Sequence, residues 1–133
     1  MVYLAGCWHN QIKTEIYFLM NDCIFCKIVA NQAPSQMVYQ DEHVSAFRDI
    51  RPAAPVHVLV VPNKHLTSVN DANPGDEALL GRLFTVARLV ARQEGIEQSG
   101  YRLIVNSGPD SGQIVFHLHM HILGGHHMKY PMG

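Results

Sequence analysis

One stretch of six residues near the C-terminus, His117-Leu118-His119-Met120-His121-Ile122, restricts the possible fold more than any other feature. Histidines and apolar residues alternate along it without a break. Because a β-strand points successive side chains to opposite faces, the pattern predicts a strand with three histidines on one face and three apolar residues on the other. The apolar face can pack in a core, whereas the histidine face needs a ligand, a metal ion or water.

Two chemical interpretations of the histidine face stand beside a purely structural one. Two imidazoles at alternate strand positions can hold a catalytic metal ion. Alternatively, one imidazole acts as a nucleophile or general base while its neighbours orient the substrate. The pattern by itself does not choose between these two kinds of site.

Composition narrows the class of protein. The chain has 133 residues, of which 47% are hydrophobic, and this predicts one domain with a real core. The net charge is −1, and the absence of a basic block argues against nucleic-acid binding. No apolar run reaches the roughly 18 residues of a transmembrane helix, so no membrane partner is expected. Three cysteines make a poor disulfide framework, which favours a reducing compartment and a cytoplasmic location.

The order of predicted elements indicates an α+β fold. Residues 1–20 fit poorly with the rest of the chain and are interpreted as an N-terminal extension to a domain of residues 21–133. A short helix is expected over residues 23–30, with Asp22 as its N-cap. Strands are expected at residues 37–39, 44–47, 56–62 and 101–106, besides the histidine strand. Helices packed on a mostly antiparallel sheet account for this order.

One long helix is expected between the third and fourth strands. Asn73 and Pro74 suit its N-cap and first position, and Gly95 suits its end. Apolar residues recur at helical spacing along it and predict the face that covers the sheet. These residues are Leu80, Leu83, Phe84, Ala87, Val90 and Ala91.

The histidine stretch, closed by Leu123-Gly124-Gly125, resembles the histidine triad (HIT) superfamily and, within it, the Hint (histidine triad nucleotide-binding) branch. The resemblance runs from about Asp22 to the C-terminus. It implies a HIT-like fold, with a mostly antiparallel sheet of about five strands, one long helix and one short helix. It also implies a homodimer in which the two sheets join.

Cys23 and Cys26 lie three residues apart, so on a helix both thiols share a face, as chelation requires. Free cysteines are also often buried as small apolar groups, and the spacing alone leaves that alternative open. Zinc-containing HIT proteins are similar in having Cys-x-x-C, the histidine of a Pro-x-Lys-His segment, here His65, and the first triad histidine, here His117. The resemblance thus implies a structural zinc ion on these four residues, with no organic cofactor.

The same resemblance assigns the chemistry. The middle histidine, His119, is the nucleophile, and its Nδ1–H points to the backbone carbonyl of His117. It attacks the α-phosphorus of a nucleotide, and water then cleaves the nucleotidyl-histidine to release AMP or GMP. Donors to the phosphate oxygens are expected from His121, His57, Asn106 and Gln113.

The resemblance also implies a nucleoside pocket. Asp49 matches the carboxylate that binds the ribose hydroxyls, and apolar residues would line the slot for the base, although the pattern alone would place them in the core. These residues are Ile24, Phe25, Ile28, Phe47 and Ile50. Ile114 departs from animal Hint proteins, which have a serine there that can assist the leaving group.

The resemblance to the Hint branch implies a purine nucleoside phosphoramidase, which cleaves P–N bonds in derivatives of AMP or GMP. A Fhit-like hydrolase of dinucleoside polyphosphates is the second enzyme considered, and the glycine pair argues against it. A non-enzymatic nucleotide-binding or interaction module and a metal-dependent hydrolase that uses the triad as ligands are the remaining alternatives.

Overall fold

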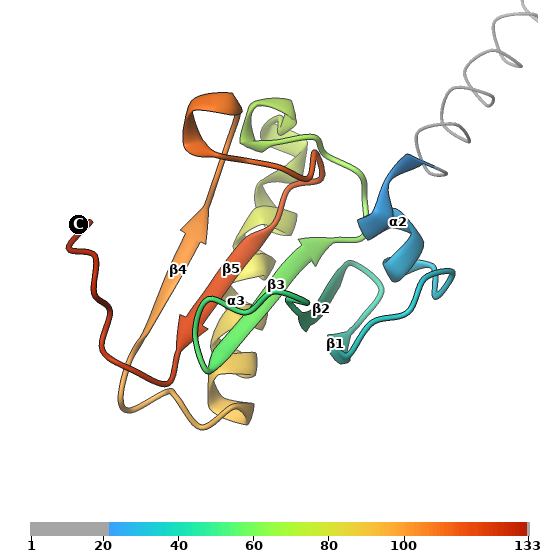
Figure 1. The fold of residues 1–133 in the computed structure, drawn as a ribbon. Coiled ribbons are helices and arrows are strands. Elements are labelled where there is room, and N and C mark those ends of the chain that lie inside the picture. Colours follow the sequence, from blue (N-terminus) through green and yellow to red (C-terminus); the bar gives the residue numbers. More distant parts are fainter. Residues whose placement is uncertain (1–21, 133) are drawn as a thin grey trace, which may run out of the picture. The chain divides into compact units, whose positions relative to one another are not determined.

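The computed structural model describes residues 22–132, in two parts, 22–34 and 35–132. The whole predicted extension, residues 1–20, and the boundary at residue 21 lie outside the described residues. In the first part, helix α2 spans Ile24–Val29 (Figure 1). Its N-cap is Cys23, whose Sγ accepts a hydrogen bond from the Cys26 amide at 3.3 Å. The expectation that Asp22 caps this helix was wrong, because the thiol takes the capping position one residue later.

The second part is built on a five-stranded antiparallel sheet in the order β1-β2-β3-β5-β4. The strands are β1 (Met37–Gln40), β2 (Val44–Arg48), β3 (Val56–Pro62), β4 (Tyr101–Val105) and β5 (Met120–Gly124). The predicted α+β fold with a sheet of about five strands is confirmed. The β-branched run of β3 lies at the centre of the sheet, where both neighbouring strands bond to it.

The long helix α3 spans Glu77–Gln93. A 3₁₀ turn, η2 (Pro74–Asp76), precedes it and is closed by a capping box between Asn73 and Asp76. Gly95 follows the helix with φ +73°, a left-handed conformation that glycine adopts at little cost. The predicted apolar face was wrong at two positions. Phe84, which was included, is 59% exposed, and Val86, which was not, is fully buried. Two further 3₁₀ turns are η1 (Val69–Asp71) and η3 (Pro109–Ser111).

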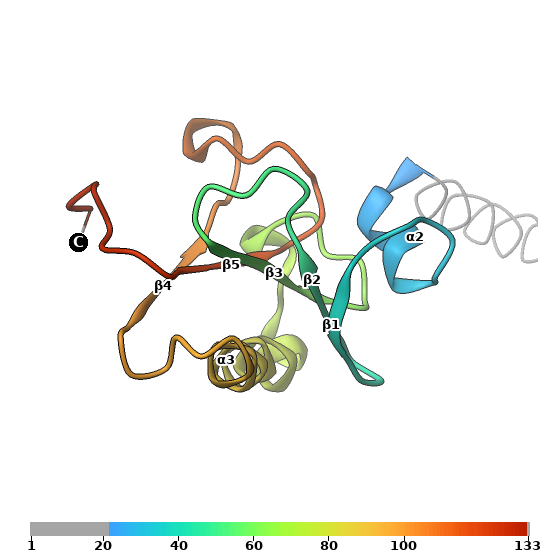
Figure 2. The same cartoon turned by 60° about the horizontal axis from the view of Figure 1, so that its bottom comes forward.

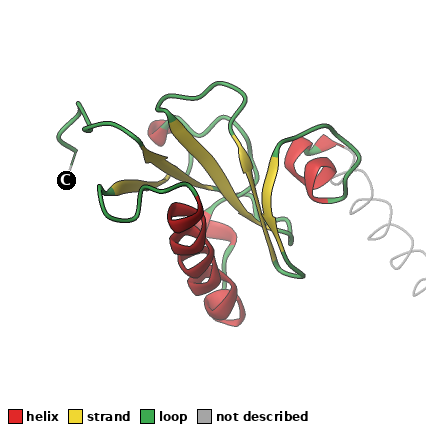
Figure 3. Ribbon diagram, turned by 90° about the horizontal axis from the view of Figure 1, so that it is seen from below, coloured by secondary structure: helices red, strands yellow, loops and turns green. Residues whose placement is uncertain are grey.

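Helix α3 covers one face of the sheet (Figures 2 and 3), and the core lies between them. Met120 and Ile122 of β5 and Val58 and Val60 of β3 point into this core and are essentially inaccessible to solvent. Since strand side chains alternate, the residues between them point to the opposite face, which carries the histidines. None of the helices in residues 22–132 is long and apolar enough to cross a membrane.

Candidate active site

The histidine stretch forms a strand over only its second half, because β5 begins at Met120. His121 lies within β5, whereas His117 and His119 precede it. In the register of β3 and β5, Val60 faces Met120, so Leu118 would pair with Pro62, which has no N–H to donate. The Leu118 amide instead donates to the Leu66 carbonyl at 2.6 Å. Leu118 is only 1% exposed and belongs to the core, but burial does not alternate along this segment, because His117 and His119 are buried as well.

The hydrogen bond of His119 defines its tautomer. Its Nδ1 lies 2.7 Å from the backbone carbonyl of His117, and His119 is buried. A carbonyl oxygen can only accept, so Nδ1 carries the proton and the neutral ring keeps a lone pair on Nε2. The expected bond from Nδ1–H of His119 to the His117 carbonyl is therefore present. The imidazole has the tautomer that a nucleophile acting through Nε2 requires.

A second chain of hydrogen bonds defines the tautomer of His121. The backbone N–H of Ala53 donates to Nδ1 of His57 at 3.0 Å, so this nitrogen carries the lone pair of the neutral ring and Nε2 carries the proton. His57 Nε2 lies 2.9 Å from Nδ1 of His121 and donates to it. His121 consequently carries its own proton on Nε2, where it can serve as a hydrogen-bond donor. The rings of His121 and His119 are in contact, with centroids 5.0 Å apart.

Both histidines of this chain are held neutral near pH 7. Burial lowers the pKa of His57, and the nearby Asp49 carboxylate opposes this effect. Burial, followed by the neighbouring His119 and His57 rings, lowers the pKa of His121 to about 4. The tautomers deduced from the hydrogen bonds therefore describe the histidine pair at neutral pH.

Asp49 follows β2 and faces the histidine pair. Its Oδ2 lies 3.4 Å from Nε2 of His57, and its Oδ1 accepts from the Arg51 amide at 2.8 Å. The structure thus brings Asp49, His57 and His121 together within 4.8 Å. The contact of Asp49 with ribose hydroxyls stays a prediction.

The two amide side chains expected at the phosphate differ in their surroundings. Asn106 directly follows β4 and is partly buried. Gln113 is buried and holds its own loop: its Oε1 accepts from the Gly108 amide at 2.9 Å. Its Nε2 donates to the carbonyls of Thr67 at 2.8 Å and Val115 at 3.0 Å. Both amide hydrogens are thus used within the protein, and a contact of Gln113 with phosphate stays a prediction.

The residues expected at the base differ widely in exposure. Phe47 is 2% exposed and Ile50 is 89% exposed, so the first is a core-like residue and the second can meet a ligand. In residues 22–34, Phe25 and Ile28 are buried and Ile24 is 46% exposed. The role of all five in binding the base stays a prediction.

His117 and His65 form a pair suited to a metal ion. His117 is fully buried, and its Nε2–H donates to the Pro62 carbonyl at 2.8 Å, which leaves the lone pair on Nδ1. This nitrogen lies 3.2 Å from Nδ1 of His65. Tetrahedral zinc with Zn–N bonds of about 2.0–2.1 Å separates two ligand nitrogens by roughly 3.3 Å. Metal-bound histidines commonly donate their other N–H to a carbonyl, as His117 does.

The cysteine pair in the other part of the structure has matching properties. Cys23 is the N-cap of α2, Cys26 lies in its first turn, and neither forms a disulfide. Burial, followed by the hydrogen bond with Cys23, raises the pKa of the Cys26 thiol to about 12, so the thiol is protonated unless a cation is bound. The amide of Cys26 donates to the Cys23 sulfur at 3.3 Å.

The alternative of a metal site on all three triad histidines is not supported by these contacts. Both ring nitrogens of His117 face partners outside the triad, and His119 directs Nδ1 to the main chain. Among residues 22–132, none of the groups suited to a metal ion combines the three.

Sequence reasoning missed the backbone groups of the site. The N–H of Ala53 and the carbonyl of Pro62 determine the tautomers of His57 and His117. Every residue except proline has the N–H and every residue the carbonyl, so residue identity carries no signal for these contacts. The two prolines that flank Ala53 and Ala54 were the one hint of a rigid loop beside the site.

Comparison with known proteins identifies the family to which this chain is similar. The model of the HIT domain family matches residues 30–128. A purine nucleoside phosphoramidase of Escherichia coli (strain K12) is 50% identical over 107 residues, which cover 80% of this chain and 90% of that protein.

Solved structures are also similar. The crystal structure of a HIT family hydrolase from Legionella pneumophila Philadelphia 1 is 44% identical, with a TM-score of 0.81 over 84% of this chain and all of that one. A zinc-bound histidine triad family protein from Mycobacterium smegmatis is 33% identical, with a TM-score of 0.67 over 77% of this chain and 73% of that one. The family match, the shared fold and the histidine geometry lead to one conclusion: this chain belongs to the HIT domain family.

Proposed function

We propose that this protein is a hydrolase that cleaves the P–N bond of purine nucleoside phosphoramidates and releases AMP or GMP. The observation that carries the proposal is the pair of tautomers deduced for His119 and His121. A nucleophilic lone pair on one ring and a hydrogen-bond donor on the next are what attack on a phosphoryl group needs. The activity in the name of the Escherichia coli relative supports the same reaction.

In the proposed reaction, Nε2 of His119 attacks the α-phosphorus, and the bond from phosphorus to the leaving nitrogen breaks. That nitrogen takes the bonding electron pair and a proton from solvent water and departs as an amine. His121 donates its Nε2–H to a phosphate oxygen and stabilises the charge that develops there. Water then attacks the same phosphorus and releases a proton to the solvent, the bond to His119 breaks and returns its electron pair to Nε2, and the nucleoside monophosphate leaves.

The supporting residues have distinct proposed roles. His57 holds the His121 tautomer instead of meeting the phosphate, and Gln113 holds the loop before the histidine stretch. Asn106 donates to the phosphate, and Asp49 binds the ribose hydroxyls. The base lies against the apolar residues predicted for it, Ile24, Phe25, Ile28, Phe47 and Ile50.

We also propose a structural zinc ion on Cys23, Cys26, His65 and His117. Two thiolates and two imidazoles fill a tetrahedral shell without an open position, so the metal supplies stability and no chemistry of its own. The 3.2 Å between the two Nδ1 atoms and the Cys-x-x-Cys turn each support this donor set. Metal analysis should find about one zinc ion per chain, and C23S/C26S should lose it and melt at a lower temperature. Retention of zinc in C23S/C26S would contradict the site.

A homodimer is the proposed assembly, with strand β4 at its centre. The described sheet has two edge strands, β1 and β4, and β4 bonds only to β5. An antiparallel partner strand would satisfy the hydrogen-bonding groups of its other edge. Sedimentation of the purified protein should give the mass of two chains, and the mass of one chain would contradict the homodimer.

The covalent step is tested with adenosine phosphoramidate. The native protein should release AMP, and mass spectrometry of a quenched reaction should find one AMP attached per chain. H119A should lose the adduct and at least about 10³-fold in rate, while it keeps its zinc and its affinity for AMP. H43A, which changes an exposed histidine in the turn between β1 and β2, is the matched control.

Each contrary result selects another function. Binding of AMP without turnover by the native protein would identify a nucleotide-binding module. Loss of the metal together with His119 would identify a metal-dependent hydrolase.

A further inference from the structure

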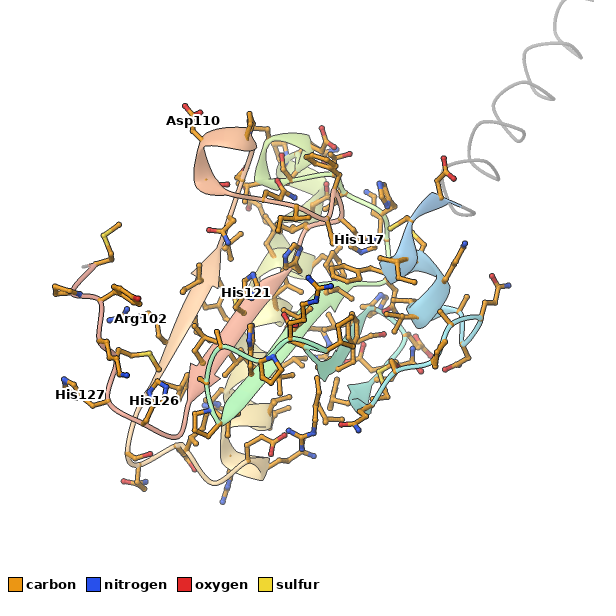
Figure 4. All side chains as sticks on the ribbon, viewed as in Figure 1. Arg102, Asp110, His117, His121, His126 and His127 are labelled. Carbon is orange, nitrogen blue, oxygen red and sulfur yellow. The ribbon has the colours of Figure 1, made fainter. Side chains whose placement is uncertain are left out.

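A second group of potential metal ligands lies apart from the cysteines. Ligand atoms of Asp49, His57 and His121 all lie within 4.8 Å of one another. His57 belongs to β3, His121 belongs to β5, and Asp49 directly follows β2; Figure 4 shows His121 on its strand. None of these three strands is an edge strand of the described sheet, so the group belongs to one chain and does not depend on a partner at β4.

The distances within this group suit a single metal ion. Nε2 of His57 lies 2.9 Å from Nδ1 of His121 and 3.4 Å from Oδ2 of Asp49. Ligand atoms bound at about 2.0–2.1 Å are separated by about 2.9 Å in octahedral and roughly 3.3 Å in tetrahedral coordination. Two imidazoles and one carboxylate are donors that divalent zinc and nickel accept, and they leave coordination positions open to water.

Two of the three ligands are in the state that a metal ion requires, and the third is not. Nδ1 of His121 carries a lone pair, and Asp49 offers a carboxylate oxygen. The N–H of Ala53, however, donates to Nδ1 of His57 at 3.0 Å, so the proton of this ring lies on Nε2. To bind a metal ion through Nε2, His57 must carry its proton on Nδ1, where it faces another donor.

The Ala53 amide therefore sets the affinity of this site. Metal-bound histidines almost always donate their other ring N–H to an acceptor, and His57 has a donor in that place. The resulting loss of a buried hydrogen bond opposes binding. A metal ion should consequently occupy this group only when it is in excess over the amount that the four-residue site on Cys23, Cys26, His65 and His117 takes up.

Asp49 connects this group with the nucleotide. Its Oδ1 accepts from the Arg51 amide at 2.8 Å, and its Oδ2 is the oxygen that faces His57. A metal ion that binds Oδ2 withdraws this acceptor from the ribose hydroxyls, for which Asp49 was proposed above. The nucleotide should then bind less tightly.

We propose that Asp49, His57 and His121 form a second, weaker site for a divalent metal ion and that an ion bound there competes with the nucleotide. The competition rests on the function proposed above, whereas the metal site rests on the geometry of the three side chains. The ions that suit these donors are Zn²⁺ and Ni²⁺. Mg²⁺ prefers oxygen ligands and should not bind.

Calorimetric titration of the full-length protein with Zn²⁺, after its structural zinc site is filled, tests the proposal. A second and weaker Zn²⁺ should bind per chain, and Mg²⁺ should show no binding. Saturation of this site with Zn²⁺ should weaken the binding of AMP by about fivefold or more. Saturation with AMP should weaken the second Zn²⁺ by the same factor, because the coupling between two ligands is reciprocal.

Three variants assign the site to its residues. D49N keeps an oxygen for the Arg51 amide but loses the charged ligand, and should weaken the second Zn²⁺ at least about tenfold. A53P lacks the opposing N–H and should tighten the second Zn²⁺ about fivefold or more. D110N is the matched control, because it changes an exposed carboxylate in η3, also visible in Figure 4, and should keep the native affinity for zinc.

The outcomes separate this inference from the proposed function. One Zn²⁺ per chain, or equal affinities of D49N and the native protein for the second Zn²⁺, would overturn the metal site. An affinity for AMP that Zn²⁺ leaves unchanged or raises would overturn the competition, and equal zinc affinities of A53P and the native protein would overturn the role of the Ala53 N–H. Failure to cleave adenosine phosphoramidate would count against the proposed function alone, because the titrations require no turnover.

Discussion

Replacement of His57 tests whether this residue controls the tautomer of His121. Ala53 needs an acceptor and His121 Nδ1 needs a donor, and neutral His57 provides both. In H57Q the amide oxygen and the amide N–H can meet the same two requirements. H57L fills a similar volume but provides neither, so the native tautomer of His121 loses the bond that selects it.

The size of the effect depends on the bond that is lost. The distance between His57 Nε2 and His121 Nδ1 is 2.9 Å, and His57 is only 7% exposed. A buried polar group left without its partner costs about 1–3 kcal/mol, which is roughly a 5- to 150-fold loss if it is expressed in the transition state. H57L should lose this much in kcat/KM for adenosine phosphoramidate, whereas H57Q should stay within about threefold of the native enzyme.

The tautomer is measured independently of activity. Long-range ¹H–¹⁵N correlation spectra of the histidine rings distinguish a protonated Nε2 from a protonated Nδ1. His121 should carry its proton on Nε2 in the native protein and in H57Q, and should shift toward Nδ1 in H57L. Equal losses of activity in the two variants, or an unchanged His121 tautomer in H57L, would refute the reasoning.

Three further predictions concern stability and turnover. Because His121 has a pKa of about 4 in the fold and about 6.5 when unfolded, the unfolded chain binds more protons between these values. The free energy of unfolding should therefore fall by up to about 3 kcal/mol as the pH drops from 6.5 to 4, and H121Q should show a shallower slope in denaturant titrations. G125A should lower the free energy of unfolding by about 2–4 kcal/mol, since Gly125 has φ +93° and a Cβ there would lie 2.8 Å from Pro55 Cβ. The control is G81A on α3, whose added Cβ meets nothing within 4 Å and should not destabilise the protein. Equal melting temperatures of the two variants would contradict this prediction. I114S should raise the turnover of phosphoramidates, because serine supplies a hydroxyl that can assist the leaving group. Ile114 is 86% exposed, so the position tolerates the change, and an unchanged rate would reject a role for this hydroxyl.

Several elements were predictable because their signals are local. The β-branched run of β3, the capping residues before α3 and the glycine after it each identify an element from a few neighbouring residues. The face of α3 was harder to assign at Phe84 and Val86. Helical spacing gives the direction of a side chain, but the width of the buried face depends on how the sheet curves beneath it.

The strand at the histidines shows a different limit. Alternation predicted a strand from His117, but the pairing begins only at Met120. The reason is Pro62 on the neighbouring strand, which cannot donate a hydrogen bond to the chain opposite. Which residue faces Pro62 depends on register, and register is a property of the assembled sheet.

The sequence by itself therefore determined the residue types of the site, the class of fold and the resemblance to one family. Alternation, spacing and turn residues carry that information, because each is a relation between near neighbours along the chain. Only the tertiary structure decided what each histidine does: His57 meets Ala53 and His121, and His117 meets Pro62 and His65. A tautomer depends on which donor or acceptor lies against each ring nitrogen, and those partners come from segments that are distant in sequence or from backbone groups common to nearly every residue.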